Sequence, residues 1–520
     1  MTRAESAETS AIPHADTQYS TNHSHSTNHN NTHHNNTGIA PTVHRPLLIA
    51  IILGFSSFCA SIMQSLVIPI QGELPQLLNA SASTTAWVIT ATLLGSAVTM
   101  PVAGKLADLH GKKPVLVASA ALLLIGSILC ASTSTVSILL IGRVLQGMAM
   151  GYIPVAISFV KQILPARMVN PAMAAISATL GVGGALGLPL AAWIAQSYDW
   201  HILFWVAAVL AAIVLVLTAT MLPFIRSEES GRLDIAGAIV LAIGLVSVLV
   251  AVTKGGTWGW TSLSTLGLIV GGVIVLLVFG FLQLRTEEPL VDLRTTASRP
   301  VLMTNLAAIL IGFGMMASSI VVPQLLQLPK ETGVGLGQTI LQAGLWMAPG
   351  GLMMMLLSPV SSALLSRFGG KVAVITGAVV LGGGYFVAAF LMGSPWELML
   401  ASCISSAGVG IGYAAMPALI MANVPAHEMS SSVGVNTLMR SLGTTTASAV
   451  MASVLTSNVV DFGGFAVPTH SAFQLCFLIG AGAAIAGALL AFAIPSARAA
   501  RKDSGAEATS AERELELADA

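Results

Sequence analysis

Charged residues are scarce in this chain of 520 residues: they make up 8% of it, against 55% apolar residues. Soluble domains carry about 25% charged residues, because their surfaces must interact with water. A water-soluble surface cannot be built from the composition found here. A bilayer removes the need for that polar surface, since about 20 consecutive apolar residues cross its hydrocarbon core. The composition therefore predicts a polytopic membrane protein.

Sequence motifs of several common chemistries are also missing. The four cysteines, Cys59, Cys130, Cys403 and Cys476, form no C-x-x-C pair and lie in apolar runs, where cysteine acts as a small hydrophobic residue. The sequence holds no H-E-x-x-H, G-x-S-x-G or P-loop motif. We therefore expect no enzyme, no ATP-driven motor, and no cofactor or metal site. The net charge of zero gives no reason to expect a nucleic-acid partner.

Long apolar runs dominate what is present, and they predict an all-α membrane protein. Fourteen segments are long enough to span a bilayer. They lie near residues 47–70, 84–104, 114–131, 136–160, 172–196, 201–222, 233–253, 262–284, 301–327, 339–365, 371–391, 397–421, 432–457 and 473–494.

Lysine and arginine are distributed unevenly among the loops. Cytoplasmic loops accumulate these residues, which gives the orientation of the chain. If the N-terminus is cytoplasmic, only Lys254 and Lys330 lie in outer loops, and Arg143 and Arg440 lie inside spans. We therefore predict a multi-pass protein of the plasma membrane with both termini in the cytoplasm. The other 18 of the 22 basic residues are predicted to be cytoplasmic, namely Arg3, Arg45, Lys105, Lys112, Lys113, Lys161, Arg167, Arg226, Arg232, Arg285, Arg294, Arg299, Arg367, Lys371, Arg498, Arg501, Lys502 and Arg513.

Polar tails flank the apolar core of the sequence. Residues 1–46 are predicted to form a disordered cytoplasmic tail, rich in histidine and asparagine, and residues 495–520 a second disordered tail. A histidine-rich tract can bind a transition metal weakly. A solvated tail is the simpler interpretation of these residues.

The chain resembles itself at an offset of 258 residues. Residues 47–222 are predicted to form one six-helix bundle and residues 301–494 a second, with two inserted helices at 233–284. Transporters of the major facilitator fold are built from two such parallel repeats, which enclose a central site. The matched pairs are Pro101 with Pro359, Gly104 with Ser362, Asp108 with Ser366, Gly111 with Gly369 and Lys113 with Lys371, and, at offsets of 261 and 262, Gly151-Tyr152 with Gly412-Tyr413 and Leu180-Gly181 with Leu442-Gly443.

The loop between the second and third spans carries a glycine and acid pattern. The stretch holds Gly104, Asp108, Gly111, Lys112 and Lys113, and it resembles the loop 2–3 signature of the major facilitator superfamily. Its glycine permits a tight turn, and its aspartate can meet a helix N-terminus or an arginine of the neighbouring bundle. We expect this contact to latch one conformation, although an ordinary basic loop would share the composition. The family's usual arginine after the aspartate is a leucine here, which weakens any contact by that residue.

Two further stretches resemble motifs of the same superfamily. Arg143, Gln146 and Gly147 resemble its R-x-x-Q-G motif, in which the arginine is associated with proton coupling or the central cavity. An arginine that holds backbone carbonyls of a neighbouring helix is the alternative. Gly183, Gly187 and Pro189 resemble the exporter motif of proton-driven antiporters, with the proline one place late. An unspecialised face for close helix packing is the alternative there.

Several stretches beyond these general motifs narrow the resemblance. They are similar to the fourteen-helix drug:proton antiporters, the EmrB/QacA-like group. The resemblance implies export of drugs or amphipathic metabolites by alternating access, in exchange for protons. A transporter of a narrower metabolite and a non-transporting sensor or scaffold remain alternatives. The stretches are residues 231–237, 258–260, 288–294, 323–327, 348–350 and Arg440 to Gly443.

Acidic residues are missing from the middle of every predicted span, although that antiporter group usually carries one in its first helix. A proton-coupled carrier needs a titrating group within the membrane, so the coupling ion is open. Arg143 and Arg440 are the only charges predicted deep in the bundles. We expect them to bond to backbone carbonyls, to glutamine or serine side chains, or to water in a cavity. Two positive charges without acids would favour anionic or electron-rich substrates.

Overall fold

The computed structural model describes residues 46–67, 70, 73–227, 231–462 and 465–495, which belong to one compact unit, Val43–Ala520. The predicted tails at 1–46 and 495–520 lie outside the described residues, apart from Pro46 and Pro495.

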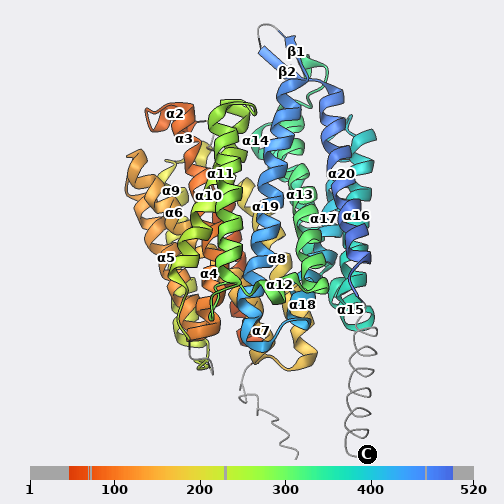
Figure 1. The fold of residues 1–520 in the computed structure, drawn as a ribbon. Coiled ribbons are helices and arrows are strands. Elements are labelled where there is room, and N and C mark those ends of the chain that lie inside the picture. The colour runs from red at the N-terminus through yellow and green to blue at the C-terminus, as the bar shows by residue number, and fades with distance from the viewer. Residues whose placement is uncertain (1–45, 68–69, 71–72, 228–230, 463–464, 496–520) are drawn as a thin grey trace, which may run out of the picture. The chain divides into compact units, whose positions relative to one another are not determined.

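Long helices run side by side along one direction (Figure 1). A helix satisfies its own backbone hydrogen bonds, which is what a segment in lipid requires. The elements are α1 (Pro46–Ser65), α2 (Leu74–Leu77), α3 (Ala82–Thr85), α4 (Trp87–His110), α5 (Lys112–Ala131), α6 (Val136–Met148), η1 (Ala149–Gly151), α7 (Tyr152–Ile163), α8 (Ala166–Ser197), α9 (His201–Met221), α10 (Ile235–Trp258), α11 (Leu263–Gln283), α12 (Leu293–Ala297), α13 (Arg299–Gln327), η2 (Lys330–Thr332), α14 (Ile340–Leu356), α15 (Ser358–Phe368), α16 (Gly370–Phe390), α17 (Pro395–Gly412), α18 (Ala415–Ala422), η3 (Ala426–Glu428), α19 (Met429–Ser457), β1 (Val459–Phe462), β2 (Phe465–Pro468) and α20 (His470–Phe492).

Thirteen helical segments of the described chain are long and apolar enough to cross a membrane, and they match thirteen of the predicted spans. The remaining predicted span is α19, which is 29 residues long but rich in serine and threonine. These hydroxyls bond to carbonyls one turn earlier, as Thr437 Oγ1 does to the Val433 carbonyl at 2.9 Å. Much of α19 is buried against other helices, so its polar side chains face protein rather than lipid.

Helix pairing repeats along the chain. In the first half α1 packs on α8, α5 on α9, and α4 on α6; in the second half α13 packs on α19, α16 on α20, and α14 on α17. Two seams join the halves, one between α4 and α19 and one between α14 and α8. The described structure therefore has the predicted major facilitator fold. The exact domain boundaries at 47–222, 233–284 and 301–494 stay a prediction.

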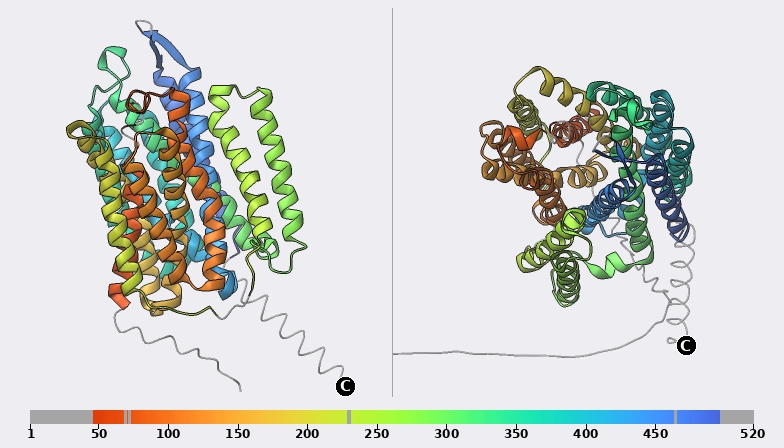
Figure 2. Two further views of the ribbon diagram at one scale, coloured as in Figure 1. Left: turned by 90° about the vertical axis from the view of Figure 1, so that its left-hand side faces the viewer. Right: turned by 90° about the horizontal axis from the view of Figure 1, so that it is seen from above.

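The inserted helices α10 and α11 attach at one of these seams. An apolar cluster joins α10 and α11 to both α4 and α19, and the green pair stands at the edge of the bundle (Figure 2). Helix α11 is outermost, and its Leu263 and Leu277 side chains are 89% and 69% exposed. Such exposed apolar side chains on a spanning helix suit contact with lipid. The cluster consists of Ala97, Leu241, Leu245, Leu249, Phe279, Leu290, Val291, Val435 and Leu438.

Three local features differ from the sequence-based expectations. Helix α8 begins at Ala166, not near 172. Lys254, expected in an outer loop, lies in α10, because that helix continues to Trp258 and stops only at Gly259, whose φ is +88°. A two-stranded antiparallel hairpin, β1 with β2, connects α19 to α20.

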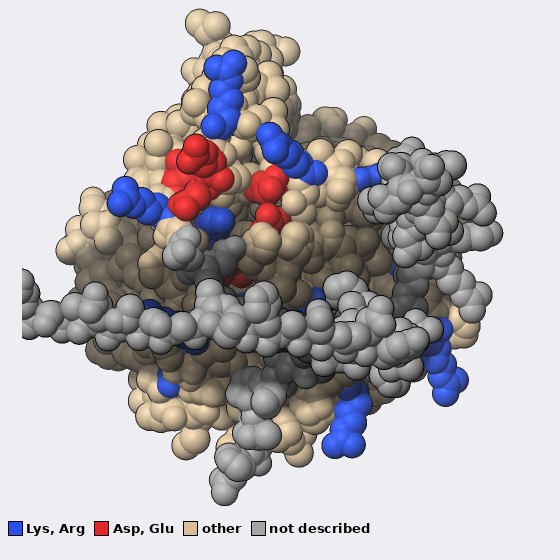
Figure 3. Space-filling model, turned by 60° about the horizontal axis from the view of Figure 1, so that its bottom comes forward, with Lys and Arg blue, Asp and Glu red and all other residues tan. Residues whose placement is uncertain are grey.

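One end of the bundle carries most of the basic residues, and we call it the basic end (Figure 3). It holds the turn between α4 and α5 and the ends of α15 and α18 (Figure 1). Lys254 and Lys330 lie toward the opposite end. The basic end therefore contains the loops predicted to face the cytoplasm, and its described basic residues are Lys105, Lys112, Lys113, Lys161, Arg167, Arg226, Arg232, Arg285, Arg294, Arg299, Arg367 and Lys371.

We predict that the basic end faces the cytoplasm. In a Cys403→Ser background, Val460→Cys in the β hairpin should react with a membrane-impermeant maleimide in intact cells. Val460 is 59% exposed at the opposite end. Arg294→Cys at the basic end should react only after permeabilisation. The reverse labelling pattern would contradict the orientation.

Candidate functional site at the basic end of a seam

Helix α4 ends beside the start of α19, and small residues allow this close approach. A methyl group at Gly104 would overlap the backbone of Ser430. One at Gly434 would likewise overlap the Met100 carbonyl. Glycine at these places lets two helix backbones touch, so the predicted motif glycine Gly104 lies at the seam itself.

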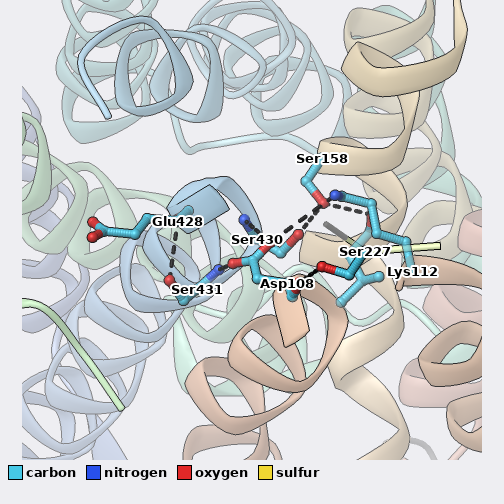
Figure 4. Close-up of polar contacts among 8 residues, drawn as sticks. Asp108, Lys112, Ser158, Ser227, Glu428, Ser430 and Ser431 are labelled. Atoms are coloured by element: carbon cyan, nitrogen blue, oxygen red, sulfur yellow. Dashed lines mark hydrogen bonds and ion pairs between the residues drawn. The ribbon is translucent and has the colours of Figure 1, made fainter. Parts of the chain in front are cut away.

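The carboxylate of Asp108 is held by the first turn of α19 (Figure 4). The Ser430 N–H donates to Oδ1 at 3.1 Å, and the Ser431 N–H donates to Oδ2 at 2.8 Å. First-turn N–H groups have no partner within their own helix, and the positive end of the helix dipole favours an anion. Asp108 is only 5% exposed, which strengthens its hydrogen bonds. Of the two partners that the sequence left open for Asp108, a helix N-terminus or an arginine, the structure has the helix N-terminus.

Side chains around Asp108 extend the contact. Lys112 Nζ lies 4.0 Å from Asp108 Oδ1, while Ser227 Oγ donates to the Asp108 backbone carbonyl. Ser158 Oγ of α7 lies 2.7 Å from Ser430 Oγ of α19. Elements from both halves of the chain therefore converge on one buried carboxylate (Figure 4).

The turn after Asp108 needs a glycine. Gly111 has φ +90°, a conformation that residues with a Cβ rarely adopt. A methyl group there would come within 2.7 Å of the Ile225 carbonyl oxygen. Lys113 is half-buried in the first turn of α5. Leu109 is buried, so the position that is arginine in the family is apolar and packed here.

Two other contacts close the basic end. Lys161 Nζ donates to the Met421 carbonyl, at the end of α18, at 2.5 Å. Asn170 Nδ2 of α8 donates to Ser366 Oγ of α15 at 3.2 Å. Ser366 is the repeat partner of Asp108, so the second seam has a related contact without a charge. That hydrogen bond is exposed, and an exposed neutral bond contributes less than a buried one to an anion.

The Arg143 motif lies inside the first half of the chain. Arg143 Nε donates to the Val88 carbonyl of α4 at 3.0 Å, and Nη1 donates to Gln146 Oε1 at 2.7 Å. Gln146 Nε2 in turn donates to Ser127 Oγ of α5 at 2.9 Å. A methyl group at Gly147 would overlap the Thr92 carbonyl. This arrangement corresponds to the structural alternative, in which the arginine holds a neighbouring helix.

The exporter-like motif of α8 packs against two helices. A methyl group at Gly183 would come within 2.5 Å of Ser61 Cβ of α1, and one at Gly187 within 3.0 Å of Ser65 Cβ. Pro189 faces α14, where a methyl group at Gly344 would lie 3.1 Å from Pro189 Cγ. The motif therefore joins α8 to its own half and to the second seam.

Arg440, the remaining sequence candidate, lies apart from Asp108. Arg440 is buried in α19, where its guanidinium lies 3.9 Å from the centroid of the Tyr413 ring. Asp199 lies between α8 and α9, outside both helices. The His201 backbone N–H donates to its Oδ1 at 2.8 Å and lowers the pKa of this carboxyl. Among the described residues, no hydrogen bond or ion pair joins Arg440 or Asp199 to Asp108.

Ser158, Ser227, Ser430 and Ser431 complete the site and were not singled out from the sequence. Ser430 and Ser431 lie 322 and 323 residues from Asp108. The only sequence signal for Ser430 and Ser431 is the run of three serines near the start of α19.

Comparison of the sequence with known protein families agrees with this fold, in which two helical halves meet at two seams. The model of the Major Facilitator Superfamily matches residues 53–448, and a second match covers residues 304–517. The chain therefore belongs to the Major Facilitator Superfamily.

Individual relatives are more distant. The multidrug transporter protein MdtP of Bacillus subtilis strain 168 is 27% identical over 419 residues, covering 79% of this chain and 75% of MdtP. The uncharacterised MFS-type transporter YhcA of the same strain is 26% identical over 345 residues, and this chain spans 64% of its length. The solved structure of the proton:xylose symporter XylE aligns over 87% of this chain and 96% of its own, with a TM-score of 0.60 and 14% identity. That likeness shows the fold alone.

We predict that Asp108→Asn opens the basic end. The variant loses a carboxylate that accepts two N–H groups, so the latched state should lose enough stability to raise the open population about tenfold. Purified protein carrying Ser158→Cys, whose site is fully buried beside Ser430, should then react about tenfold faster with a maleimide. The matched control is Asp234→Asn, because Asp234 caps α10 through the Gly237 N–H at 2.7 Å within the insert. Equal labelling rates in the Asp108 and Asp234 variants would contradict the prediction.

We also predict that an acid at the repeat position restores closure. In the Asp108→Asn background, Ser366→Asp should accept from the Asn170 amide near the start of α8 and slow maleimide labelling of Ser158→Cys by several-fold. Ser366→Asn lacks the charge and should leave the fast rate unchanged. If the two substitutions behave alike, the second seam does not respond to charge.

Proposed function

We propose that this chain is a secondary active transporter of the plasma membrane that exports drugs or amphipathic metabolites by alternating access. We further propose that it belongs to the fourteen-helix drug:proton antiporter group and that both termini are cytoplasmic. The latch of Asp108 on α19 is the observation that carries the proposal. The multidrug transporter MdtP among its relatives supports the drug-export part.

A contact between the two halves at one end of a seam suits a rocking mechanism. The halves must separate at the basic end to admit substrate from the cytoplasm, and the Asp108 bonds must then break. Hydrogen bonds to a charged group contribute roughly 1.5–3 kcal/mol each, and about 1.4 kcal/mol changes an equilibrium tenfold. Two such bonds therefore favour the closed state strongly, yet substrate binding can still reverse the preference.

Proton exchange, we propose, involves protonation of the Asp108 carboxylate. Among the described residues Asp108 is the one buried carboxylate, and no acid lies in the middle of a described span. A proton on Asp108 would remove the charge that α19 holds and loosen the seam. For exchange, the proton must reach Asp108 from the outer side while the basic end is closed; it then favours opening of the basic end and leaves to the cytoplasm as substrate enters.

The test is dye transport by everted membrane vesicles with an imposed proton gradient. Vesicles containing the protein should accumulate ethidium, rhodamine 123 or carboxyfluorescein faster than vesicles without it, and collapse of the gradient should stop accumulation. Asp108→Asn should reduce gradient-driven accumulation about tenfold at equal protein level, because its latch no longer responds to protons. Asp234→Asn is the control.

Two outcomes would contradict the proposal. If vesicles with and without the protein accumulate all three dyes equally, export of amphipathic compounds is wrong, and transport of a narrower metabolite becomes the better account. If Asp108→Asn keeps full gradient-driven accumulation, Asp108 has no part in coupling.

A further inference from the structure

The two buried arginines differ in how their donors are used. Arg143 donates to the Val88 carbonyl and to Gln146, so it is bound within the protein. Arg440 is equally buried, at 4% exposure, but its Nη1 has no hydrogen-bond partner among the described residues. A buried donor without a partner is costly, and a buried charge is more so. Of the two arginines, Arg440 is therefore the one with a buried nitrogen that lacks a partner among the described residues.

The surroundings of Arg440 fix its position without neutralising it. The guanidinium lies 3.9 Å from the centroid of the Tyr413 ring, a cation–π contact that holds its plane. Among the described residues no carboxylate pairs with it; the ion pairs found there involve other residues. Arg440 lies ten residues beyond Ser430 along α19, or about 15 Å at 1.5 Å per residue. It is therefore well inside the bundle, beyond the closed basic end.

The repeat shows that this charge belongs to one half only. Tyr152 is the repeat partner of Tyr413 at an offset of 261, and its hydroxyl lies 3.2 Å from Thr218 Oγ1. At the offset of 262 the position equivalent to Arg440 is Ala178. The fold thus accommodates the tyrosine without an arginine, so packing alone does not require the buried charge.

A second unpartnered atom lies one helical turn before Arg440. Asn436 is fully buried, and its Nδ2 donates to Asn305 Oδ1 of α13 at 2.9 Å. Its Oδ1 has no hydrogen-bond partner among the described residues. Residues i and i+4 share one helix face. That face of α19 therefore presents a cationic donor and a neutral acceptor together.

We propose that Arg440 and Asn436 bind an organic anion with a hydroxyl or N–H group beside its acidic group. The carboxylate or sulfonate accepts from Arg440, and the neighbouring hydroxyl or N–H donates to Asn436 Oδ1. Tyr413 is a positioning residue that holds the guanidinium. This inference rests on the proposed transport function and names the substrate class of that same transporter.

The test is equilibrium binding of carboxyfluorescein to the purified protein, followed by fluorescence anisotropy. This probe carries carboxylates on a benzene ring and a hydroxyl group on the xanthene ring that is bonded to it. Arg440→Gln should weaken its binding by about tenfold to a hundredfold, because it loses a hydrogen bond to a charged group. Arg440→Lys should recover part of the affinity, since it restores the charge without the planar fork. Arg294→Gln, which removes an exposed charge at the basic end, is the matched control.

Ethidium binding separates an anion site from general damage. Ethidium affinity should not fall in Arg440→Gln, and uptake of ethidium by vesicles should persist there if the protein transports it. Equal carboxyfluorescein affinity of wild type and Arg440→Gln would overturn the anion site. Arg440-dependent binding without uptake of any dye would instead preserve the site and overturn export as the function.

Discussion

A buried carboxylate at the first turn of a helix from the other half of the chain is the interaction on which this structure depends. Asp108 accepts the Ser430 and Ser431 N–H groups and is almost inaccessible to solvent. Helix α19 leaves those N–H groups without partners of its own. The contact therefore satisfies both sides, and separation of the halves would leave an anion and two donors exposed.

The rest of the α4–α19 seam is arranged around that contact. Gly104 and Gly434 let the two backbones touch, and the serine-rich sequence of α19 keeps its helix polar enough to line an interior. The inserted α10 covers the same seam through apolar contacts with both helices. Opening at the basic end must therefore change the packing of α10 on α4 or on α19. The second seam has only the neutral Asn170–Ser366 bond at the corresponding place.

The sequence was sufficient for the architecture because apolar length and loop charge are local properties. It counted residues 432–457, most of α19, among the apolar spans, although α19 is rich in serine and threonine. It also placed Asp108 at a helix end beside a glycine turn. The partners of Asp108 could not be predicted, because Ser430 and Ser431 are more than 300 residues away along the chain.

The hydrogen-bond partners of the two buried arginines could not be predicted from the sequence either. Both are buried charges in apolar helices, and their sequence contexts gave no reason to treat them differently. The Val88 carbonyl and Gln146 take up the donors of Arg143, whereas Tyr413 offers Arg440 a ring face and no acceptor. Helix rotation decides this difference, and one sequence does not reveal it. The most direct test of the latch is the distance between spin labels at Pro114→Cys in α5 and His427→Cys in η3, measured in wild type and in Asp108→Asn. We expect one short distance in wild type and an added population at longer distance in the variant; identical distributions would contradict the claim that Asp108 holds the basic end closed.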